Sequence, residues 1–553
     1  MSLPARPSPR LVAGGIVAAA GMVAAITIVS RVVGLGRWVV FSNSVGATCL
    51  GQVYATANQV PNVLYEAAAG GALAAVAVPL ISTYLNRGDE RNADRTASAL
   101  LTWALLALLP ISMGVILLAN PLSVLLLGNS TACSAQASHR VAALMLLAFA
   151  PQIALYGVGV VLTGVLQAHR RFAAAALAPL LSSLVVIGTY VIYGAMYDPK
   201  VPLDLAPASG ILLLALGTTA GVVALSVPLL LPTLAAGVRL RPRLRFPEGT
   251  AARAGALALA GLVAVLGQQA VVIVALLLSN RVGVGTINVY TYTQTAYLLP
   301  YALLVVPLAT VAFPRLSDPT EGAATLRRTM SGVLVAGIVA VAALVAVRRE
   351  IGAIFVSLDA GGSGAGREAL LAMPDALASY APGLLGFSMA ALLTRALYAV
   401  GSPLRAAIAV SAGWAVAAVL PVGAFFMADV DSPTQVLVLM GVSSSLGMTL
   451  SALMLTRAVR TSWGFAATAG SGPAFGAALF AGVAVVGARE VLAVTSVLPG
   501  IEQGALSAIL VAAVTGVVLL AAIGAAVGAR EPDHLASVLA RLRRRSPAED
   551  RTP

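Results

Sequence analysis

The sequence predicts an all-α polytopic membrane protein with about fourteen transmembrane helices in two pseudo-symmetric lobes around a central cavity. Of its 553 residues, 59% are hydrophobic and only 10% are charged, and the mean hydropathy is +0.94. A soluble globule of this size needs more polar residues to cover its surface. The apolar runs are mostly near the ~20 residues that cross a hydrocarbon layer of about 30 Å, and they are too long for the strands of an outer-membrane barrel.

The apolar segments follow one another along almost the whole chain. Arg6 and Arg10 precede the first segment, which has no convincing small-residue cleavage site, so we expect a retained first helix rather than a signal peptide. The segments cover approximately residues 11–44, 48–83, 96–127, 138–168, 172–195, 208–235, 252–279, 285–314, 328–347, 375–400, 403–428, 434–457, 465–488 and 503–529. Bends in the long early segments are expected at glycines, namely Gly34, Gly36, Gly70 and Gly71.

Arginine is concentrated in the loops after the even-numbered segments. These loops contain Arg87, Arg91 and Arg95; Arg170 and Arg171; Arg239, Arg241, Arg243, Arg245 and Arg253; Arg315, Arg327 and Arg328; Arg405; and Arg457 with Arg460, and the C-terminal tail adds Arg541, Arg543, Arg544 and Arg545. Because positive charge marks cytoplasmic loops, this alternation predicts that both termini are cytoplasmic. Residues 348–374, with Arg348, Arg349 and Arg367, fit the alternation least well.

An internal repeat predicts the lobes. AAVAVPLIS at 74–82 resembles ATVAFPRLS at 309–317, and VYATANQ at 53–59 resembles VYTYTQT at 289–295 at almost the same offset. The copies fall on the second and eighth segments and therefore run in the same direction, which implies an axis along the membrane normal and a shared central cavity. Chance similarity between helices rich in alanine and valine is the alternative.

The repeat and the basic stretches together predict the divisions of the chain. We expect an N-terminal lobe at 1–238, a basic cytoplasmic linker at 239–253, a C-terminal lobe at 254–460, two further helices at 461–530 and a basic cytoplasmic tail at 531–553. The linker has no aromatic interleaving, so we expect no nucleic-acid partner. The GGSGAG run at 361–366 follows no strand and precedes no Lys-Ser/Thr pair, so it is expected to be a flexible external loop rather than a phosphate loop.

Enzyme chemistry has little support in the sequence. The histidines, His139, His169 and His534, fall in predicted loops or in the tail, and the cysteines have no metal-ligand spacing. We therefore expect a transporter that uses no cofactor. Cys49 and Cys133 fall on the predicted outer face, where a disulfide and two unpaired thiols are both open interpretations.

Three ionisable residues, Arg31, Arg37 and Glu66, lie inside apolar segments, where charges are costly and are candidates for function. The six-residue spacing of the arginines places them roughly 120° apart around a helix and ~9 Å apart along its axis. This separation suits an extended polyanion such as a pyrophosphate with its attached groups. The alternative is structural, with Arg37 reaching an interface and Arg31 pairing with Glu66. Glu66 either balances an arginine when the substrate is absent or titrates and couples protons.

Uncharged polar side chains accompany these charges on two pairs of segments. The second segment contains Gln52, Asn58, Gln59, Asn62 and Tyr65, and the seventh and eighth contain Gln268, Gln269, Asn280, Asn288, Tyr290, Tyr292 and Gln294. The candidate substrate-binding residues among them are Gln52, Gln59, Asn62, Gln269, Tyr292 and Gln294. The alternative is that such residues join helices to one another, which is the commoner role of polar side chains in membranes.

Several motifs resemble those of one known family. They are SRVVGLGR at 30–37, VPNVLYEAAAGGALAAVAVPLISTY at 60–84, QAHRRF at 167–172, TYTQTAYLLPYALLVVPLATVAFPRLS at 291–317 and LLTRALYAVGSPLR at 392–405. The chain resembles the MurJ/MviN-type lipid II flippases of the multidrug/oligosaccharidyl-lipid/polysaccharide exporter superfamily. The resemblance implies a transporter of the bacterial plasma (inner) membrane that acts in peptidoglycan and cell-wall biosynthesis.

The resemblance also assigns roles to residues. It implies that Arg31 and Arg37, which match the arginines of the family's first-helix motif, engage the pyrophosphate of the lipid-linked precursor. The sequence departs from the family where Trp38 and Gln52 replace acidic residues, and where Tyr65-Glu66 and Thr295 replace basic ones. The family's sodium site uses carboxylates in its seventh and eleventh helices, and segments 252–279 and 403–428 contain none.

The expected function is movement of lipid II, an undecaprenyl-pyrophosphate-linked peptidoglycan precursor, from the cytoplasmic to the outer leaflet by alternating access. The expected partners are this lipid or a related polyprenyl-pyrophosphate-linked glycan, the membrane lipids, and enzymes of cell-wall synthesis. The alternatives are a flippase for another polyprenyl-linked glycan, a transport-inactive scaffold for cell-envelope assembly, and a proton-coupled drug exporter that uses Glu66.

Overall fold

The computed structural model describes residues 9–68, 73–128, 133–316, 318, 321–468, 472–494 and 504–530. These ranges are helical with short connections and contain no β-strand, and 13 of their helices are long and apolar enough to cross a membrane. The predicted all-α polytopic fold class is therefore confirmed. By their contacts, the residues form two compact units: Met1–Tyr292 with Asp359–Arg367, and Thr293–Leu358 with Glu368–Pro553.

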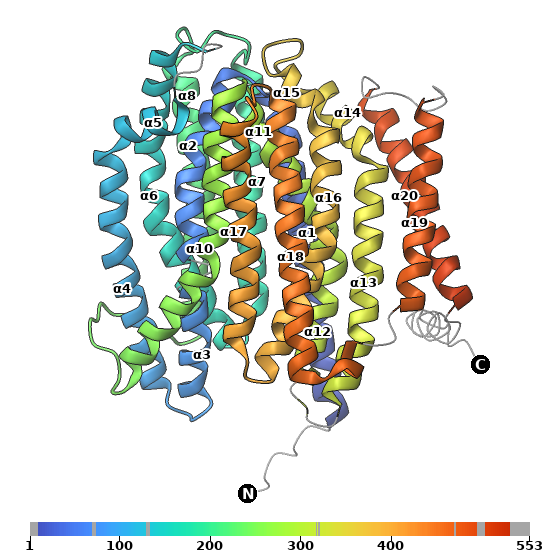
Figure 1. Ribbon diagram of the computed structural model, residues 1–553. Coiled ribbons are helices and arrows are strands. Elements are labelled where there is room, and N and C mark those ends of the chain that lie inside the picture. Colours follow the sequence, from blue (N-terminus) through green and yellow to red (C-terminus); the bar gives the residue numbers. More distant parts are fainter. Residues whose placement is uncertain are drawn as a thin grey trace, which may run out of the picture. The chain divides into compact units, whose positions relative to one another are not determined.

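In the first unit the long helices lie side by side (Figure 1). They are α1 (Pro9–Ser44), α2 (Cys49–Glu66), α3 (Ala74–Leu85), α4 (Glu90–Leu117), α5 (Ala119–Leu127), α6 (Ala135–Ala168), α7 (Phe172–Met196), α8 (Ala208–Ser226), the short helices η2 (Val227–Leu229) and α9 (Leu230–Leu234), α10 (Thr250–Val282) and α11 (Thr286–Pro300), which continues into the second unit. Side-chain oxygens cap several N-termini: Thr48 accepts from Gly51 N at α2, and Asp89 accepts from Asn92 N at α4.

Helix α6 is central in the first unit because it packs against α2, α3, α4, α7 and α8. Val161 and Val165 belong to an apolar cluster with residues of α3, α4 and α10, whereas Leu162 and Leu166 pack against α7 and η2. All four side chains are fully buried. A helix that buries apolar side chains on more than one face is expected to lie inside a bundle rather than at its lipid-facing edge.

The second unit is also a helix bundle. It contains the π-helical segment η3 (Tyr301–Val305), α12 (Val306–Leu316), α13 (Gly322–Ala346), α14 (Arg348–Leu358), α15 (Arg367–Leu371), α16 (Met373–Ala399), α17 (Pro403–Met427), α18 (Pro433–Trp463), η4 (Phe465–Thr468), α19 (Gly472–Val494) and α20 (Ala505–Arg530). Small residues let α16 and α18 approach closely: a Cβ at Gly383 would lie 2.8 Å from Ser445 Cα. The Gly383 amide donates to Ser445 Oγ at 3.0 Å, so this contact is also a hydrogen bond between the helices.

The thirteen long helices correspond to predicted segments, and the remaining one, 48–83, is divided between α2 and α3. The predicted bends at Gly70 and Gly71 lie outside the described residues, and α1 continues without interruption through Gly34 and Gly36. The repeat copies have similar local structure. The first contains π-helical turns between α2 and α3, and the second contains η3 between α11 and α12. The boundaries of the two compact units are defined by contacts between residues, and they do not coincide with those of the internal repeat. The lobe, linker and tail boundaries therefore stay predictions.

Candidate functional site

The two arginines of α1 lie on a helix that packs against α7. Arg31 is exposed and Arg37 is half-buried, with its Nε buried and without a hydrogen-bond partner. The Arg37 guanidinium carbon lies 5.1 Å from the centroid of the Trp38 ring, so the aromatic face supplies part of its environment. Within the described part of the chain, no carboxylate lies within ion-pair distance of either arginine. Their positive charge is therefore left for another partner.

The end of α2 brings further predicted residues towards Arg31. The charge of Arg31 acts on the Glu66 carboxyl and on the Tyr65 hydroxyl. The Glu66 side chain is exposed, and the ion pairs among the described residues do not include one between Arg31 and Glu66. The structural alternative of a direct Arg31–Glu66 bridge is thus not what the structure shows.

Helix α6 contributes to the same region through Tyr156. Its hydroxyl donates to Asn62 Oδ1 at 3.3 Å, and its ring centroid lies 4.2 Å from that of Tyr65. The charge of Arg37 also acts on Tyr156. We name this group the arginine–tyrosine face, which consists of Arg31, Arg37, Asn62, Tyr65, Glu66 and Tyr156. It combines two guanidiniums with amide and phenol groups, which can bind an anion and hydroxyl-rich substituents beside it.

A buried aromatic cluster supports the face next to Arg37. Phe41 packs against Trp38 with ring centroids 5.6 Å apart, against Tyr54 at 5.2 Å and against Tyr190 at 5.1 Å. The Tyr54 hydroxyl shares hydrogen bonds of 2.7 Å with the hydroxyls of Tyr190 and Thr218. These contacts join α1 to α2, α7 and α8, so they fix the position of α1 and of the arginine that it carries.

The candidate Gln52 has a different role in the structure. Its amide nitrogen donates to Asn280 Oδ1 at 3.1 Å, and its amide oxygen accepts from Gly285 N at 3.2 Å. Asn280 in turn donates to Thr56 Oγ1 at 3.0 Å and to Leu126 O at 2.9 Å. Both ends of the Gln52 side chain are engaged in joining helices, which is the alternative that the sequence left open for uncharged polar residues.

The other polar candidates are distributed over several elements. Gln59 is half-buried on α2, and Gln269 is buried on α10. Tyr292 is fully buried, and its ring centroid lies 6.0 Å from that of Trp38. Gln294 belongs to the second unit. The structure therefore groups Arg31, Arg37, Asn62 and Glu66, whereas substrate binding by the remaining candidates stays a prediction.

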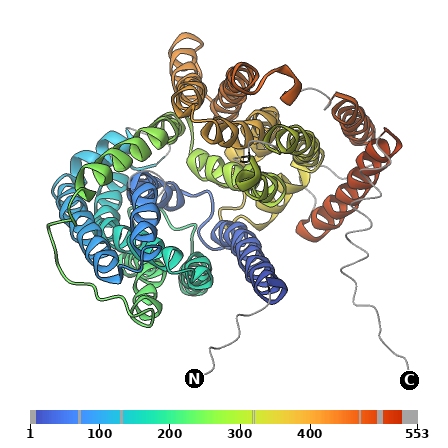
Figure 2. The ribbon, with the colours of Figure 1, turned by 90° about the horizontal axis from the view of Figure 1, so that it is seen from below.

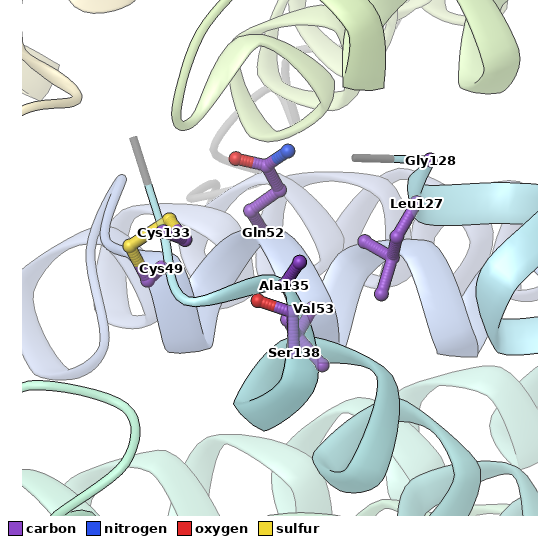
Figure 3. A pocket seen from close by; sticks show the side chains of 8 residues that line it. All are labelled: Cys49, Gln52, Val53, Leu127, Gly128, Cys133, Ala135 and Ser138. Atoms are coloured by element: carbon purple, nitrogen blue, oxygen red, sulfur yellow. A yellow bond between two sulfur atoms is a disulfide. The ribbon is translucent and has the colours of Figure 1, made fainter. Parts of the chain in front are cut away.

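Cys49 and Cys133 form a disulfide at the N-terminal end of α2, with Cα atoms 6.0 Å apart. Figure 3 shows this disulfide beside a small cavity, which is lined by Cys49, Gln52, Val53, Leu127, Gly128, Cys133, Ala135 and Ser138. The cavity has room for about one water molecule, so it cannot hold a lipid headgroup. The question of bonded or free cysteines is thereby answered in favour of the bond.

The loop that contains the GGSGAG run is fastened at its first residues rather than free. Asp359 accepts hydrogen bonds from Ala47 N at 2.8 Å and Ser42 Oγ at 3.1 Å through Oδ1, and from Gly361 N at 2.9 Å through Oδ2. The Ala360 amide donates to Ser42 O at 2.8 Å. Burial raises the pKa of Asp359 above its ordinary value, although these hydrogen bonds counteract part of the rise.

Sequence reasoning named Tyr65 but did not single out Tyr54 of α2, Tyr156 of α6 or Tyr190 of α7. Of the segments that contain Tyr54, Tyr156 and Tyr190, only that of Tyr54 also contains a charged candidate, Glu66. Their hydroxyl partners come from distant segments, such as Thr218 for Tyr54. These tyrosines are identified from the structure, by searching the helices near Arg37 for buried hydroxyl groups.

Comparisons with known proteins agree with one another. The family model described as "Lipid II flippase MurJ" matches residues 41–503. A curated relative, the probable lipid II flippase MurJ of Vibrio cholerae serotype O1, is 36% identical over 110 residues. That alignment spans only about a fifth of the relative, since it covers 20% of this chain and 20% of the other.

Solved structures share the fold. A structure of lipid II flippase MurJ in an inward closed conformation matches with a TM-score of 0.69 at 18% identity, over 90% of this chain and 97% of that one. An inward-facing multidrug resistance MATE family transporter of the MOP superfamily matches with a TM-score of 0.61 at 12% identity, over 79% of this chain and 96% of that one. A family match over most of the sequence and a shared fold lead to one assignment: the chain belongs to the lipid II flippase MurJ family, whose members are transporters and not enzymes.

Proposed function

We propose that this protein moves lipid II from the cytoplasmic to the outer leaflet by alternating access. The observation that carries the proposal is the arginine–tyrosine face, where two arginines of an apolar helix have no carboxylate partner within ion-pair distance among the described residues. A positive charge without a partner is costly in such a helix, and an anionic substrate would offset this cost. Family membership supplies the class of substrate.

The pyrophosphate of the lipid is the group that fits the arginines. Arg31 and Arg37 remain about 9 Å apart along the uninterrupted helix α1, so they suit an extended anion with two phosphates better than a single small one. The family model begins at residue 41, so this role rests on the geometry of the face rather than on the alignment. Glu66 would balance Arg31 when no substrate is bound, because their charges already interact.

The phenol and amide groups suit the rest of the headgroup. Tyr156 and Asn62 already form a hydrogen bond, and the Tyr65 ring lies against the Tyr156 ring at a tilt of 31°. Sugar hydroxyls and peptide amides can exchange hydrogen bonds with such groups as the headgroup passes. Gln59 and Gln269 are proposed as further contacts, together with Tyr292 and Gln294, whereas Gln52 is already occupied by Asn280 and Gly285. No ion coupling is needed if the membrane potential, negative inside, favours outward movement of negative charge by ~2.3 kcal/mol per charge per 100 mV.

We propose that the protein lies in a bacterial inner membrane with both termini on the cytoplasmic side. The disulfide between Cys49 and Cys133 supports it, because disulfides persist on the oxidising side of the membrane and Cys49 follows the first membrane-spanning helix. The arginine-rich loops then fall on the cytoplasmic side. Enzymes that make lipid II in the cytoplasm and use it outside are the proposed functional partners.

The test is depletion of this protein in its host, followed by leaflet-resolved quantification of lipid II. Complementation uses wild type, Arg37→Ala and the matched control Arg327→Ala, which removes an exposed arginine at the start of α13. We expect inner-leaflet accumulation that wild type and Arg327→Ala reverse and Arg37→Ala does not, at equal abundance in the membrane. Accumulation of another polyprenyl-linked glycan instead would reassign the cargo, and full rescue by Arg37→Ala would favour a scaffold.

A further inference from the structure

The segment that joins α9 to α10 lies extended along α4, on the outside of the first unit (Figure 2). The backbone amides of Arg239, Arg241 and Arg243 donate hydrogen bonds to side chains of α4. Their acceptors are Asp94 Oδ2 at 3.2 Å, Ser98 Oγ at 3.1 Å and Thr102 Oγ1 at 2.9 Å. Trp103 Nε1 donates to Leu244 O at 3.0 Å and continues the row of contacts.

The spacing of these bonds makes the segment rigid. Acceptors four residues apart on a helix are separated by about 6 Å, and two residues of an extended chain span about 6.6 Å, so the two repeats match. In an extended chain alternate side chains point to the same side. Leu240 and Phe246 pack against the apolar cluster of α3, α4, α6 and α10. The side chains of Arg239, Arg241, Arg243 and Arg245 are all exposed. We name these four residues the arginine comb.

The comb lies between the ends of two candidate membrane spans. The preceding span ends at Leu234 and the following span begins at Thr250, and residues 239–245 run along the first half of α4, from Asp94 to Trp103. Two large apolar side chains beside the comb are exposed, Trp103 at 50% and Leu244 at 59%. Tryptophan is typical of the membrane–water interface. The surface therefore presents guanidiniums beside apolar groups that fit the edge of the acyl chains.

We propose that the arginine comb binds the phosphate groups of anionic glycerophospholipids in the leaflet next to it. Guanidiniums form paired hydrogen bonds with phosphate, and the neighbouring Trp103 and Leu244 favour a ligand with a lipid body over a soluble anion. The carboxylates near the comb are Glu90 and Asp94 of α4 and Glu248, and that of Asp94 already accepts a hydrogen bond from the Arg239 amide. The inference stands apart from the proposed cargo, whose face lies on α1, α2 and α6.

The experiment compares full-length variants in detergent by counting the lipids that each retains in native mass spectrometry. The probes are phosphatidylglycerol and phosphatidylcholine. The comb variant changes Arg239, Arg241, Arg243 and Arg245 to Gln, which keeps the backbone bonds. The matched control changes Arg315, Arg327, Arg328 and Arg405 to Gln, which removes the same charge from exposed arginines of the second unit. A third variant, Ser98→Ala with Thr102→Val, keeps the charges and removes two acceptors of the extended segment.

We expect wild type to prefer phosphatidylglycerol and the comb variant to lose that preference at least ten-fold, since each arginine near an anionic surface contributes about a five-fold effect. The control variant is expected to change the preference for phosphatidylglycerol by no more than two- to three-fold. If the rigid spacing of the arginines contributes to binding, the third variant is expected to lose more of this preference than the control and less than the comb variant. Equal losses in the comb variant and the control would overturn the proposal, because net charge alone would then explain binding.

A second arm separates lipid from cargo chemistry. Farnesyl pyrophosphate, a soluble polyprenyl pyrophosphate, is added to wild type loaded with phosphatidylglycerol. We expect it to leave the comb-dependent phosphatidylglycerol in place and to bind equally to wild type and to the comb variant. Displacement of phosphatidylglycerol, together with loss of farnesyl pyrophosphate binding in the comb variant, would overturn the proposal and make the comb an entry site for the pyrophosphate lipid.

Discussion

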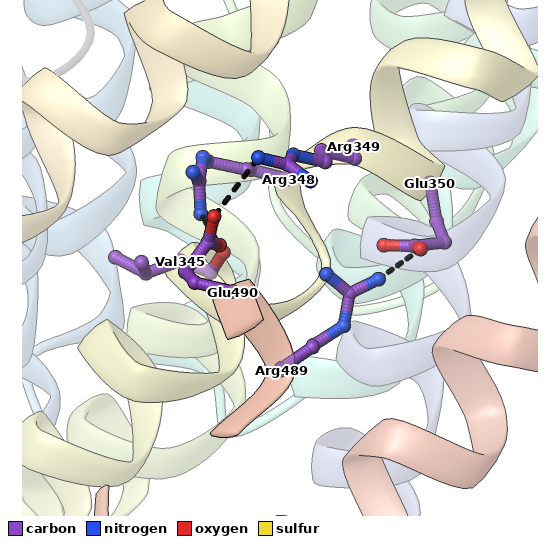
Figure 4. A network of polar contacts seen from close by, with 6 residues as sticks. All are labelled: Val345, Arg348, Arg349, Glu350, Arg489 and Glu490. Atoms are coloured by element: carbon purple, nitrogen blue, oxygen red, sulfur yellow. Dashed lines mark hydrogen bonds and ion pairs between the residues drawn. The ribbon is translucent and has the colours of Figure 1, made fainter. Parts of the chain in front are cut away.

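Two groups of arginines in this protein lie in apolar surroundings, and they differ in whether a carboxylate forms an ion pair with them. In the second unit, Arg348 and Arg349 reach Glu490 at 2.6 and 2.9 Å, and Arg489 pairs with Glu350 (Figure 4). The Arg489–Glu350 pair is almost completely buried, with side-chain exposures of 5% and 0%. In the first unit, Arg31 and Arg37 have no carboxylate at ion-pair distance among the described residues.

The difference separates arginines that join helices from the arginines that we propose bind the substrate. A buried arginine with its own carboxylate is neutralised inside the protein and joins helices, here α14 to α19. An arginine beside tyrosines and an exposed glutamate keeps its charge available. In a membrane this arrangement is expected where a ligand supplies the missing anion. The following changes test whether the two groups differ in this way.

The largest expected effect is on stability, from Arg489→Ala. The change leaves the Glu350 carboxylate buried without its partner, which costs about 3–5 kcal/mol. We expect a marked fall in the thermal unfolding midpoint of the purified protein and in its yield. Glu490→Gln is the matched control: its side chain is 30% exposed, so the cost is expected to be about 1 kcal/mol or less.

A variant that fails to fold would leave the size of this effect unmeasured, so a double change is included. Glu350→Leu with Arg489→Met replaces the pair by apolar side chains and is expected to recover most of the stability, because well-packed apolar groups often replace buried ion pairs without loss. If the double variant is as unstable as Arg489→Ala, the pair is not what holds these helices together.

The second effect is on transport, from Arg37→Ala. Loss of a hydrogen-bonded charge costs about 1.5–3 kcal/mol, or roughly 10- to 100-fold in substrate movement. Because Arg37 has a buried nitrogen without a partner, the unfolding midpoint is expected to stay the same or to rise. Lipid II accumulation in depleted cells and thermal unfolding measure the two quantities. A fall in stability as large as that of Arg489→Ala would remove the distinction between the two groups.

A third change examines a buried carboxylate whose hydrogen bonds come from backbone amides and a hydroxyl. Asp359→Ala removes the acceptors of the Ala47 amide and the Ser42 hydroxyl, at an expected cost of about 1–3 kcal/mol for the fastened loop. Hydrogen exchange of residues 44–48 and 359–367 is expected to become faster, and less so in Asp359→Asn, which keeps one acceptor. Asp198→Ala, in an exposed loop, is the control. Unchanged exchange in Asp359→Ala would show that other contacts hold the loop.

The helices were predictable from the sequence, whereas the partners of polar residues were not. Run length and the alternation of arginine loops define membrane helices because both depend on local composition. Gln52 pairs with Asn280 across 228 residues, and Asp359 binds Ala47 across 312. Nothing in the local sequence distinguishes Gln52, which joins helices, from Gln59, because the same side chain serves either purpose. The arginines of the candidate site stand out in the sequence for the opposite reason, since a charge in an apolar run is conspicuous wherever its partner lies.

The smallest effect is expected from Glu66→Gln, and it tests how free the charge of Arg31 is. Glu66 is exposed and interacts with Arg31 through space rather than in a direct pair, so its removal is expected to change stability by less than about 1 kcal/mol. If Glu66 only balances Arg31, the variant binds a pyrophosphate lipid up to a few-fold more tightly and still exports lipid II without dependence on a proton gradient. If export by wild type depends on that gradient and collapses in Glu66→Gln, then Glu66 carries a proton, unlike Glu350 and Glu490 of the second unit, which are held in ion pairs with arginines.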